Sequence, residues 1–239
     1  TLRVGWQQNI LPTAAATVPT WVPEELLSQS TIPEEVPVLT LGEVAPLAKQ
    51  QSFRPSDNGA TRYTEVDLAD VDKQTGEISD ARLKQAGDFK GSKTPFIEGD
   101  LLFARIRPSL NNVVIAQRPH PDLPSDMCGS SEWIRLQPQH EGHFALVAAR
   151  SRFVRDQLKS TGGQTRPRIK ADDLPYLFVP DPGVDNRSSI DRIVSAAFDA
   201  RLRARNQLDA VTALYEQFGR GEIDEIALSA ALAEIERNA

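Results

Sequence analysis

The pattern of apolar and polar positions divides the chain into three parts. Residues 1–37 carry prolines at short intervals from Pro12 to Pro37. Because proline fixes φ and lacks a backbone donor, this part is predicted to be an extended lead-in or linker. Residues 38–183 hold short apolar runs between turn residues, whereas residues 184–239 repeat apolar residues at helical spacing. We therefore expect a linker, a β-rich domain and a helical region, in that order.

The middle part is predicted to be mainly β-strand. Strand-sized runs rich in β-branched and aromatic residues are RYTEVDL, KQTGEIS, DLLFARI, NVVIAQ and SEWIRLQP. Tyr63 and Trp133 lie within such runs and are expected in the core. A short helix is expected after Thr40, where Glu43 completes a capping box, and residues 141–159 show helical spacing. The segment DDLPYLFVPDP is expected to be a last buried strand or an extended segment, so the fold class is α+β.

The last part is predicted to contain one long helix with an uncovered apolar face. Residues 186–218 lack proline and glycine, so they can form a helix of roughly 50 Å. Apolar residues recur there at alternating steps of four and three, as in a coiled coil, interrupted by Arg201. Residues expected to face a partner helix are Ile190, Val194, Ala197, Leu208, Val211, Tyr215 and Phe218. Gly219 and Gly221 are expected to end the helix, and residues 222–238 to form a shorter one that folds back. A second copy or another protein is expected to cover the remaining apolar face.

Composition is that of a globular protein. Hydrophobic residues make up 40% of the chain and charged residues 25%, and no apolar run approaches the roughly 20 residues of a membrane span. Cys128 is the single cysteine, and the start of the chain lacks a signal-peptide pattern. We expect a cytoplasmic protein with no membrane partner. The chain begins at Thr1 rather than at methionine, so its N-terminal context is open.

Charge is unevenly distributed along an acidic chain. The net charge of −6 argues against nucleic-acid binding by bulk charge alone. Residues 101–121 nevertheless hold Arg105, Arg107 and Arg118 and no acidic residue. Residues 150–170 contain one acidic residue, Asp156, and the basic residues Arg150, Arg152, Arg155, Lys159, Arg166, Arg168 and Lys170. Two locally basic segments are candidates for contact with an anionic partner.

The loop after the helix predicted at 141–159 is rich in groups that bind anions. Its candidate DNA contacts are Ser160, Thr161, Gly162, Gly163, Gln164, Thr165, Arg166 and Arg168. Backbone N–H groups of a glycine turn can approach phosphate closely, and arginines supply salt-dependent affinity. Arg166 and Arg168 flank Pro167, so one can face DNA while the other braces the loop. The alternative is a solvated loop that caps the preceding helix.

The segment FARIRPSLNN supplies the other candidate contacts. Arg105 and Arg107 are expected on one face of a strand, because side chains alternate with period two. A guanidinium is well suited to bidentate recognition of guanine. Asn111 and Asn112 are able to bond adenine edges, but the turn that Pro108 starts is the favoured explanation for them.

Catalytic patterns are absent from the sequence. His140 and His143 are the only close histidine pair, and no cysteine or histidine nearby completes a metal site, so no metal is expected. The sequence contains no Gly-rich phosphate loop, no GxSxG, no HExxH and no Asn-Pro-Pro-aromatic methyltransferase motif. We therefore expect no catalytic residues in this chain.

Several phrases in one order resemble the specificity subunit of type I restriction-modification systems. They are RYTEVDLADVDKQTGEI, IEGDLLFARIRPSLNNVVIA, GSSEWIRLQP, LKSTGGQTRPRIKADDLPYLFVPDP and the long helix that follows. The resemblance runs from about Arg54 to Phe218, and it rests on order and spacing because no single phrase is specific.

The resemblance implies a division of labour. In that family a target recognition domain reads half of a split DNA site, and separate modification subunits carry adenine-N6 methyltransferase chemistry. It implies that residues 38–183 are a target recognition domain and that residues 184–239 are a helical spacer and dimerisation region. The implied partners are double-stranded DNA, a methyltransferase subunit or domain, and a restriction subunit, in phage defence. This chain is then not an enzyme and binds no cofactor; S-adenosylmethionine is expected on the methyltransferase.

Family members have two recognition domains and two long helices, whereas this chain has one of each. The resemblance therefore implies a half-size subunit that dimerises through its long helix, or the C-terminal domain of a fused methyltransferase-nuclease polypeptide. A protein-interaction module of another defence complex, with incidental basic loops, is the remaining alternative.

Overall fold

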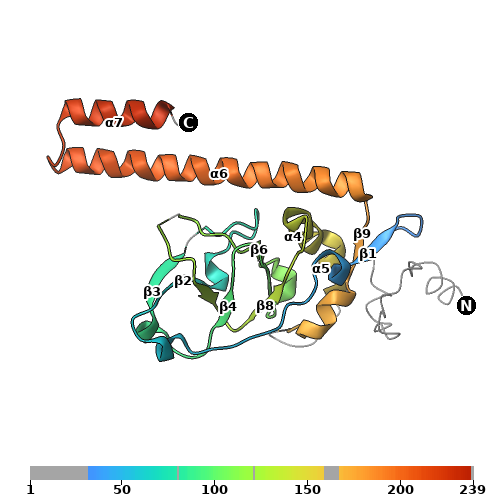
Figure 1. Cartoon of the computed structure of the whole chain (residues 1–239). Helices are drawn as coiled ribbons and strands as arrows, with labels where there is room; N and C mark the ends of the chain where they lie inside the picture. The colour runs from blue at the N-terminus through green and yellow to red at the C-terminus, as the bar shows by residue number, and fades with distance from the viewer. Residues whose placement is uncertain (1–31, 80, 121, 159–166, 238–239) are drawn as a thin grey trace, which may run out of the picture. The chain divides into compact units, whose positions relative to one another are not determined.

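A β-rich domain precedes one long and one shorter C-terminal helix in the computed structural model of the chain (Figure 1). The structure describes residues 32–79, 81–120, 122–158 and 167–237. The predicted lead-in therefore lies outside the described residues up to residue 31. Within the described ranges, no helix combines the length and the apolar character needed to cross a membrane.

The predicted α+β class is confirmed by the elements. The strands are β1 (Val38–Thr40), β2 (Arg62–Val66), β3 (Arg82–Gln85), β4 (Thr94–Phe96), β5 (Leu101–Ala104), β6 (Val113–Ile115), β7 (Met127–Gly129), β8 (Trp133–Leu136) and β9 (Phe178–Pro180). The α-helices are α3 (Leu41–Val44), α4 (Gly142–Arg150), α5 (Arg152–Leu158), α6 (Val184–Gly219) and α7 (Glu225–Arg237). The short 3-10 helices are η1 (Pro55–Asn58), η2 (Leu68–Asp70), η3 (Ala86–Asp88), η4 (Pro108–Leu110) and η5 (Ala171–Tyr176). Thr40 and Glu43 form the predicted capping box at α3.

Among the described residues the strands form sheets with the orders β1-β9, β3-β2-β7-β4 and β6-β5-β8. Strand β7 lies inside the four-stranded sheet, parallel to β2 and antiparallel to β4. Sequence patterns missed β7, because its run of Met, Cys and Gly is short. Trp133 joins two sheets: it lies on β8, and its indole Nε1 donates to the Val66 carbonyl of β2 at 3.0 Å. The side chains of Trp133 and Tyr63 are 1% and 6% exposed, which confirms their predicted core positions.

The prediction of a strand at residues 73–79 is wrong. That segment forms a turn, because the Asp72 carboxylate accepts hydrogen bonds from the amides of Gln74 and Thr75. Gly76 then adopts φ +77° and donates to the Asp72 carbonyl at 2.7 Å. A single antiparallel bridge, Val71 to Ile78, is formed across the turn. Local side-chain hydrogen bonds therefore replace the expected ladder.

The helix predicted at 141–159 is interrupted at Ser151. Helix α4 ends there, with Ser151 in extended conformation, and α5 follows with the Ser151 hydroxyl accepting from the Val154 amide at 3.3 Å. A serine that caps a new helix start explains the break. The two short helices can therefore pack on different elements: α4 lies against β6 and α5 against η4.

The long helix is confirmed as α6, which has 36 residues. It ends at Gly219, and Gly221, the other glycine of the predicted stop, adopts φ +72°; the Glu222 amide donates to the Gln217 carbonyl and the Gly221 amide to the Phe218 carbonyl. This is the Schellman arrangement, in which a glycine supplies the left-handed residue. Asp224 then caps α7 through the Ala227 amide at 2.8 Å, and the chain reverses direction between the two helices (Figure 1).

The chain divides into two compact units, residues 1–191 and 192–239. The first turns of α6 belong to the first unit. Asp191 on α6 accepts hydrogen bonds from the amides of His143 and Phe144 at 2.7 and 3.1 Å. It therefore caps α4, whose own N-cap residue has no side-chain cap.

Candidate nucleic-acid interface

The two basic segments of the sequence meet in an antiparallel pairing. The Arg107 amide donates to the Pro167 carbonyl at 2.8 Å, and the Ile169 amide donates to the Arg105 carbonyl at 3.0 Å. Ile106 and Arg168 form the bridge between these hydrogen bonds. Residues 60 to 64 positions apart in sequence thus place three arginines on adjacent backbone. We call residues 105–111 together with 167–169 the arginine pairing.

The backbone of Arg107 differs from the expectation. Strand β5 ends at Ala104, and Arg107 adopts the left-handed conformation with φ 48° and ψ 55°. The period-two alternation therefore does not extend from Arg105 to Arg107, since it requires extended backbone. Arg107 is exposed, and among the described residues its side chain has no hydrogen bond or ion pair.

The other two arginines are more constrained. Arg105 is half-buried, and its Nε has no hydrogen-bond partner in the described part of the chain. Arg168 is exposed and its Nη2 lies 2.5 Å from the Glu132 carboxylate. Arg168 is therefore already paired with an acidic residue, which partly neutralises its charge.

The asparagines lie where the turn interpretation places them. Asn111 ends η4 in left-handed conformation with φ 63°, and its amide donates to the Pro108 carbonyl. The Asn112 side chain is only 7% exposed, and its Oδ1 has no partner among the described atoms. Asn111 therefore serves the backbone of the turn that follows Arg107. The Asn112 side chain is buried and does not lie at the surface.

Most of the predicted glycine loop lies outside the described residues. Those candidates are Ser160, Thr161, Gly162, Gly163, Gln164, Thr165 and Arg166. The described chain resumes at Pro167, directly in the arginine pairing.

Arg150 was not singled out as a site residue, yet it connects the loop of Arg107 to the rest of the domain. Its Nη1 donates to the carbonyls of Asn111 and Val113 at 3.1 and 2.9 Å. Its Nη2 donates to the carbonyls of Lys73 and Gln74 at 2.7 and 3.0 Å. Burial lowers the pKa of the Arg150 guanidinium from its usual value, against the attraction of Asp72. No sequence signal separates this arginine from its basic neighbours, because its acceptors are backbone carbonyls of distant turns.

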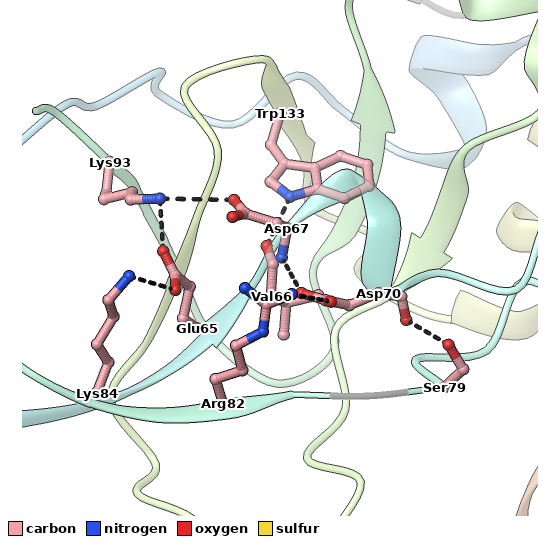
Figure 2. Close-up of polar contacts among 9 residues, drawn as sticks. All are labelled: Glu65, Val66, Asp67, Asp70, Ser79, Arg82, Lys84, Lys93 and Trp133. Atoms are coloured by element: carbon pink, nitrogen blue, oxygen red, sulfur yellow. Dashed lines mark hydrogen bonds and ion pairs between the residues drawn. The ribbon is translucent and has the colours of Figure 1, made fainter. Parts of the chain in front are cut away.

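Three other cations of the domain, Lys84, Lys93 and Arg135, are held by ion pairs with buried carboxylates. Figure 2 shows Lys84 and Lys93 pointing at Glu65, which is 1% exposed, with nitrogen to oxygen distances of 2.9 and 2.5 Å. Arg135 pairs likewise with the buried Asp100 at 2.8 Å. These charges stabilise the interior and are not available to a ligand.

Nothing in the described residues indicates catalytic or metal chemistry. Groups of three or more His, Cys, Asp or Glu that could hold a metal ion are not found there. Cys128 is buried, and burial raises the pKa of its thiol to about 12, so it is not a nucleophile at neutral pH.

The fold is similar to those of two solved structures. The crystal structure of the HsdS subunit from Thermoanaerobacter tengcongensis aligns with 77% of this chain, with a TM-score of 0.56 and 25% sequence identity. The chain has the HsdS fold. A second structure, solved to explain complex assembly and conformational transition of the type I R-M system, aligns with 77% of the chain at a TM-score of 0.57 and 24% identity. The predicted resemblance to type I specificity subunits is thereby confirmed.

This HsdS-like chain spans 50% of the length of each matched chain. No protein-family model and no curated protein sequence matches it.

The predicted partner-helix residues are largely uncovered within the chain. Ile190 and Val194 are half-buried and Ala197 is exposed. The exposed fractions of the other four are 66% for Leu208, 38% for Val211, 71% for Tyr215 and 41% for Phe218. Exposed large apolar side chains at heptad spacing are typical of a helix that packs on another helix.

Proposed function

We propose that this HsdS-like chain is a sequence-specific DNA recognition module of a type I restriction-modification complex with adenine-N6 methyltransferase activity, and that it reads one half of a target site. The observation that carries the proposal is the arginine pairing, which joins both basic segments of an acidic chain on adjacent backbone. The HsdS fold supports it.

The proposed partners follow from this role. Double-stranded DNA contacts the arginine pairing and residues 160–166, and a methyltransferase subunit or domain supplies S-adenosylmethionine and the catalysis. A restriction subunit completes the proposed complex. Because the chain spans half of each HsdS-like match, it acts either as a half-size subunit that dimerises through α6 or as one domain of a longer polypeptide. We place the protein in the cytoplasm, where these partners act.

Duplex binding tests the proposal directly. The 239-residue chain is titrated with random-sequence duplex DNA at several salt concentrations. Each phosphate contact adds about 0.9 to the slope of log affinity against log salt. The double variant Arg166→Ala and Arg168→Ala is expected to bind more weakly and to lose about 1 to 2 from that slope, because Glu132 partly neutralises Arg168, with an unchanged thermal midpoint.

The control is Arg118→Ala, because Arg118 lies in the first basic segment but is paired with Glu98 at 3.0 Å. Its slope is expected to stay within error of the wild type. Absent or salt-independent binding by the wild type would contradict the proposal and favour a protein-interaction module, for which the exposed apolar residues of α6 are the supporting observation.

Association through α6 gives a second prediction. The double variant Leu208→Asp and Tyr215→Asp is expected to reduce self-association, or association with the methyltransferase subunit of the same system, at least about 10-fold. Burying a carboxylate in an apolar helix contact is costly. Both side chains are more than half exposed in the chain itself, so its folding should be retained.

Sedimentation velocity of the full chain, alone and with the methyltransferase subunit, measures this association. The matched control is Ala213→Asp, an exposed position on α6 away from the heptad residues. Equal association constants for both variants and the wild type would rule out α6 as the partner surface.

A further inference from the structure

We propose that Arg107 is the specificity-determining residue of this interface, reading a guanine edge in the major groove, and that Arg150 is the positioning residue that holds its loop. This inference rests on the proposed function, which does not itself say which arginine reads sequence and which arginines only neutralise phosphate.

The backbone of Arg107 is held in a conformation that its residue type disfavours. Arg107 and Asn111, at the two ends of η4, have φ values of 48° and 63°. A non-glycine residue there costs roughly 1 to 2 kcal/mol, and such residues cluster at ligand-binding positions. Arg107 thus has an unfavourable backbone conformation that the surrounding structure must stabilise, whereas asparagine tolerates the left-handed region at Asn111.

Hydrogen bonds on both sides supply that stabilisation. On one side, the Arg107 amide donates to the Pro167 carbonyl at 2.8 Å, and the Arg107 carbonyl accepts from the Leu110 amide at 2.9 Å. On the other side, the Arg150 guanidinium donates to the Asn111 carbonyl at 3.1 Å and to two carbonyls of the turn at Lys73 and Gln74. The loop is therefore attached at each end.

Arg150 has little freedom to move. The guanidinium packs against Gly76 so closely that a Cβ there would lie 2.8 Å from its Nη1. Charge-assisted hydrogen bonds to four carbonyls are stronger than neutral ones and match the planar fork of arginine. A lysine at this position cannot reach four acceptors with the same geometry. Arg150 therefore links the loop of Arg107 to the turn at 72–77 through hydrogen bonds, so that the turn fixes where the loop lies.

A residue with a rigidly held backbone and an unpaired side chain is suited to recognising the edge of a DNA base. A phosphate contact tolerates a mobile cation, whereas a bidentate contact to guanine O6 and N7 needs a guanidinium held within a fraction of an ångström. Of the arginine pairing, Arg168 is bound to Glu132 and Arg105 is half-buried. Arg107 combines an exposed side chain without a described partner and a doubly attached backbone.

The test compares the sequences that each variant selects from a random duplex library, using the full chain. The wild type is expected to select a motif that contains a guanine. Arg107→Gln is expected to lose the guanine preference at one position or change it to adenine, because a glutamine amide fits adenine N6 and N7. Its affinity for the wild-type motif should fall about 5- to 100-fold, while the other positions of the motif are retained.

Arg150→Lys tests the positioning role. Preference is expected to weaken at the same position that Arg107→Gln affects, after correction for the folded fraction from thermal melting. A merely structural residue would lower the folded fraction and leave the selected motif unchanged. If Arg150→Lys does not fold, Gly76→Ala displaces the same guanidinium from the other side, although it also strains the backbone at φ +77°. After the same correction for folded fraction, it should weaken the preference at the same position.

Arg118→Gln is the control and should select the wild-type motif. An unchanged motif in Arg107→Gln with uniformly weaker binding to every duplex would overturn the inference, since that is the behaviour of a phosphate contact, and would leave the proposed function standing. A wild-type chain that selects no motif and binds without salt dependence would instead remove the proposed function.

Discussion

Gly129→Ala is expected to lower the free energy of unfolding by about 4 kcal/mol, the largest effect of a single substitution that we predict. Gly129 lies inside the four-stranded sheet, opposite Val66 of the parallel neighbour β2. A Cβ at this position would overlap the Val66 carbonyl oxygen and would lie 3.0 Å from two atoms of the Trp133 indole. Backbone cannot move away as a flexible side chain can.

The overlap with the Val66 carbonyl would break a hydrogen bond as well as disturb the packing. The Val66 carbonyl accepts from the buried Trp133 indole at 3.0 Å, so displacing it leaves a buried donor unsatisfied. Urea denaturation measures the loss. Gly87→Ala is the matched control, because a Cβ at Gly87 would meet nothing within 4 Å, and its stability should change by less than about 1 kcal/mol. Equal midpoints for the two variants would refute this account of the sheet.

Glu65→Gln is expected to cost about 3 kcal/mol at neutral pH, because it leaves the half-buried Lys84 without its counter-charge and Lys93 with only the more distant Asp67, at 3.5 Å. Glu65 is 1% exposed, and the side chains of Lys93 and Lys84 are 13% and 30% exposed. Both ammonium groups also lie over the ring of Phe89, at 5.6 and 5.0 Å from its centre. Mutual repulsion of these cations then opposes folding.

The pH dependence has a definite sign. Burial by itself would raise the pKa of Glu65, but the hydrogen bonds and charges of Lys93 and Lys84 outweigh it and lower that pKa below its usual value. The stabilisation is therefore present above the pKa of an unfolded glutamate, about 4.3, and is lost as pH falls through the lower folded value. The stability difference between the wild type and Glu65→Gln should narrow as the pH falls through that range.

Chemical denaturation at neutral and acidic pH measures both effects. Glu98→Gln is the control, since Glu98 also has a lowered pKa, from Arg118 acting against burial, but its side chain is 43% exposed. An exposed pair contributes only about 0 to 1 kcal/mol. A loss at Glu65 no larger than at Glu98 would mean that the buried pair does not stabilise the domain.

Local patterns predicted the elements that depend on neighbours in sequence. The capping box at Thr40, the glycine stop at Gly221 and the long helix α6 all result from residues a few positions apart. The same reasoning failed at residues 73–79, where the carboxylate of Asp72 competes for backbone amides that a strand would use. Strand β7 was missed because its place between β2 and β4 results from pairing with distant strands.

The candidate interface was likewise only partly predictable from the sequence. Both basic segments were evident in the sequence, and Arg105, Arg107 and Arg168 were named from residue type and spacing. Their meeting at the bridge between Ile106 and Arg168 was not, because β pairing over such a separation depends on how the whole domain folds. The role of Arg150 was invisible for the same reason, since its acceptors are carbonyls of two turns.

The sequence by itself determined the α+β class, the long helix with its apolar heptad residues and the presence of two basic segments in an acidic chain. Each of these is encoded in periodicity or in local charge, which need no knowledge of distant contacts. Tertiary structure alone decided that the two segments pair, that Arg107 is left-handed and exposed while Arg168 is paired, and that Lys84 and Lys93 neutralise Glu65 in the interior. The physical reason is that a charge is available to a ligand only where the fold leaves it without an internal partner, and partners are set by long-range packing.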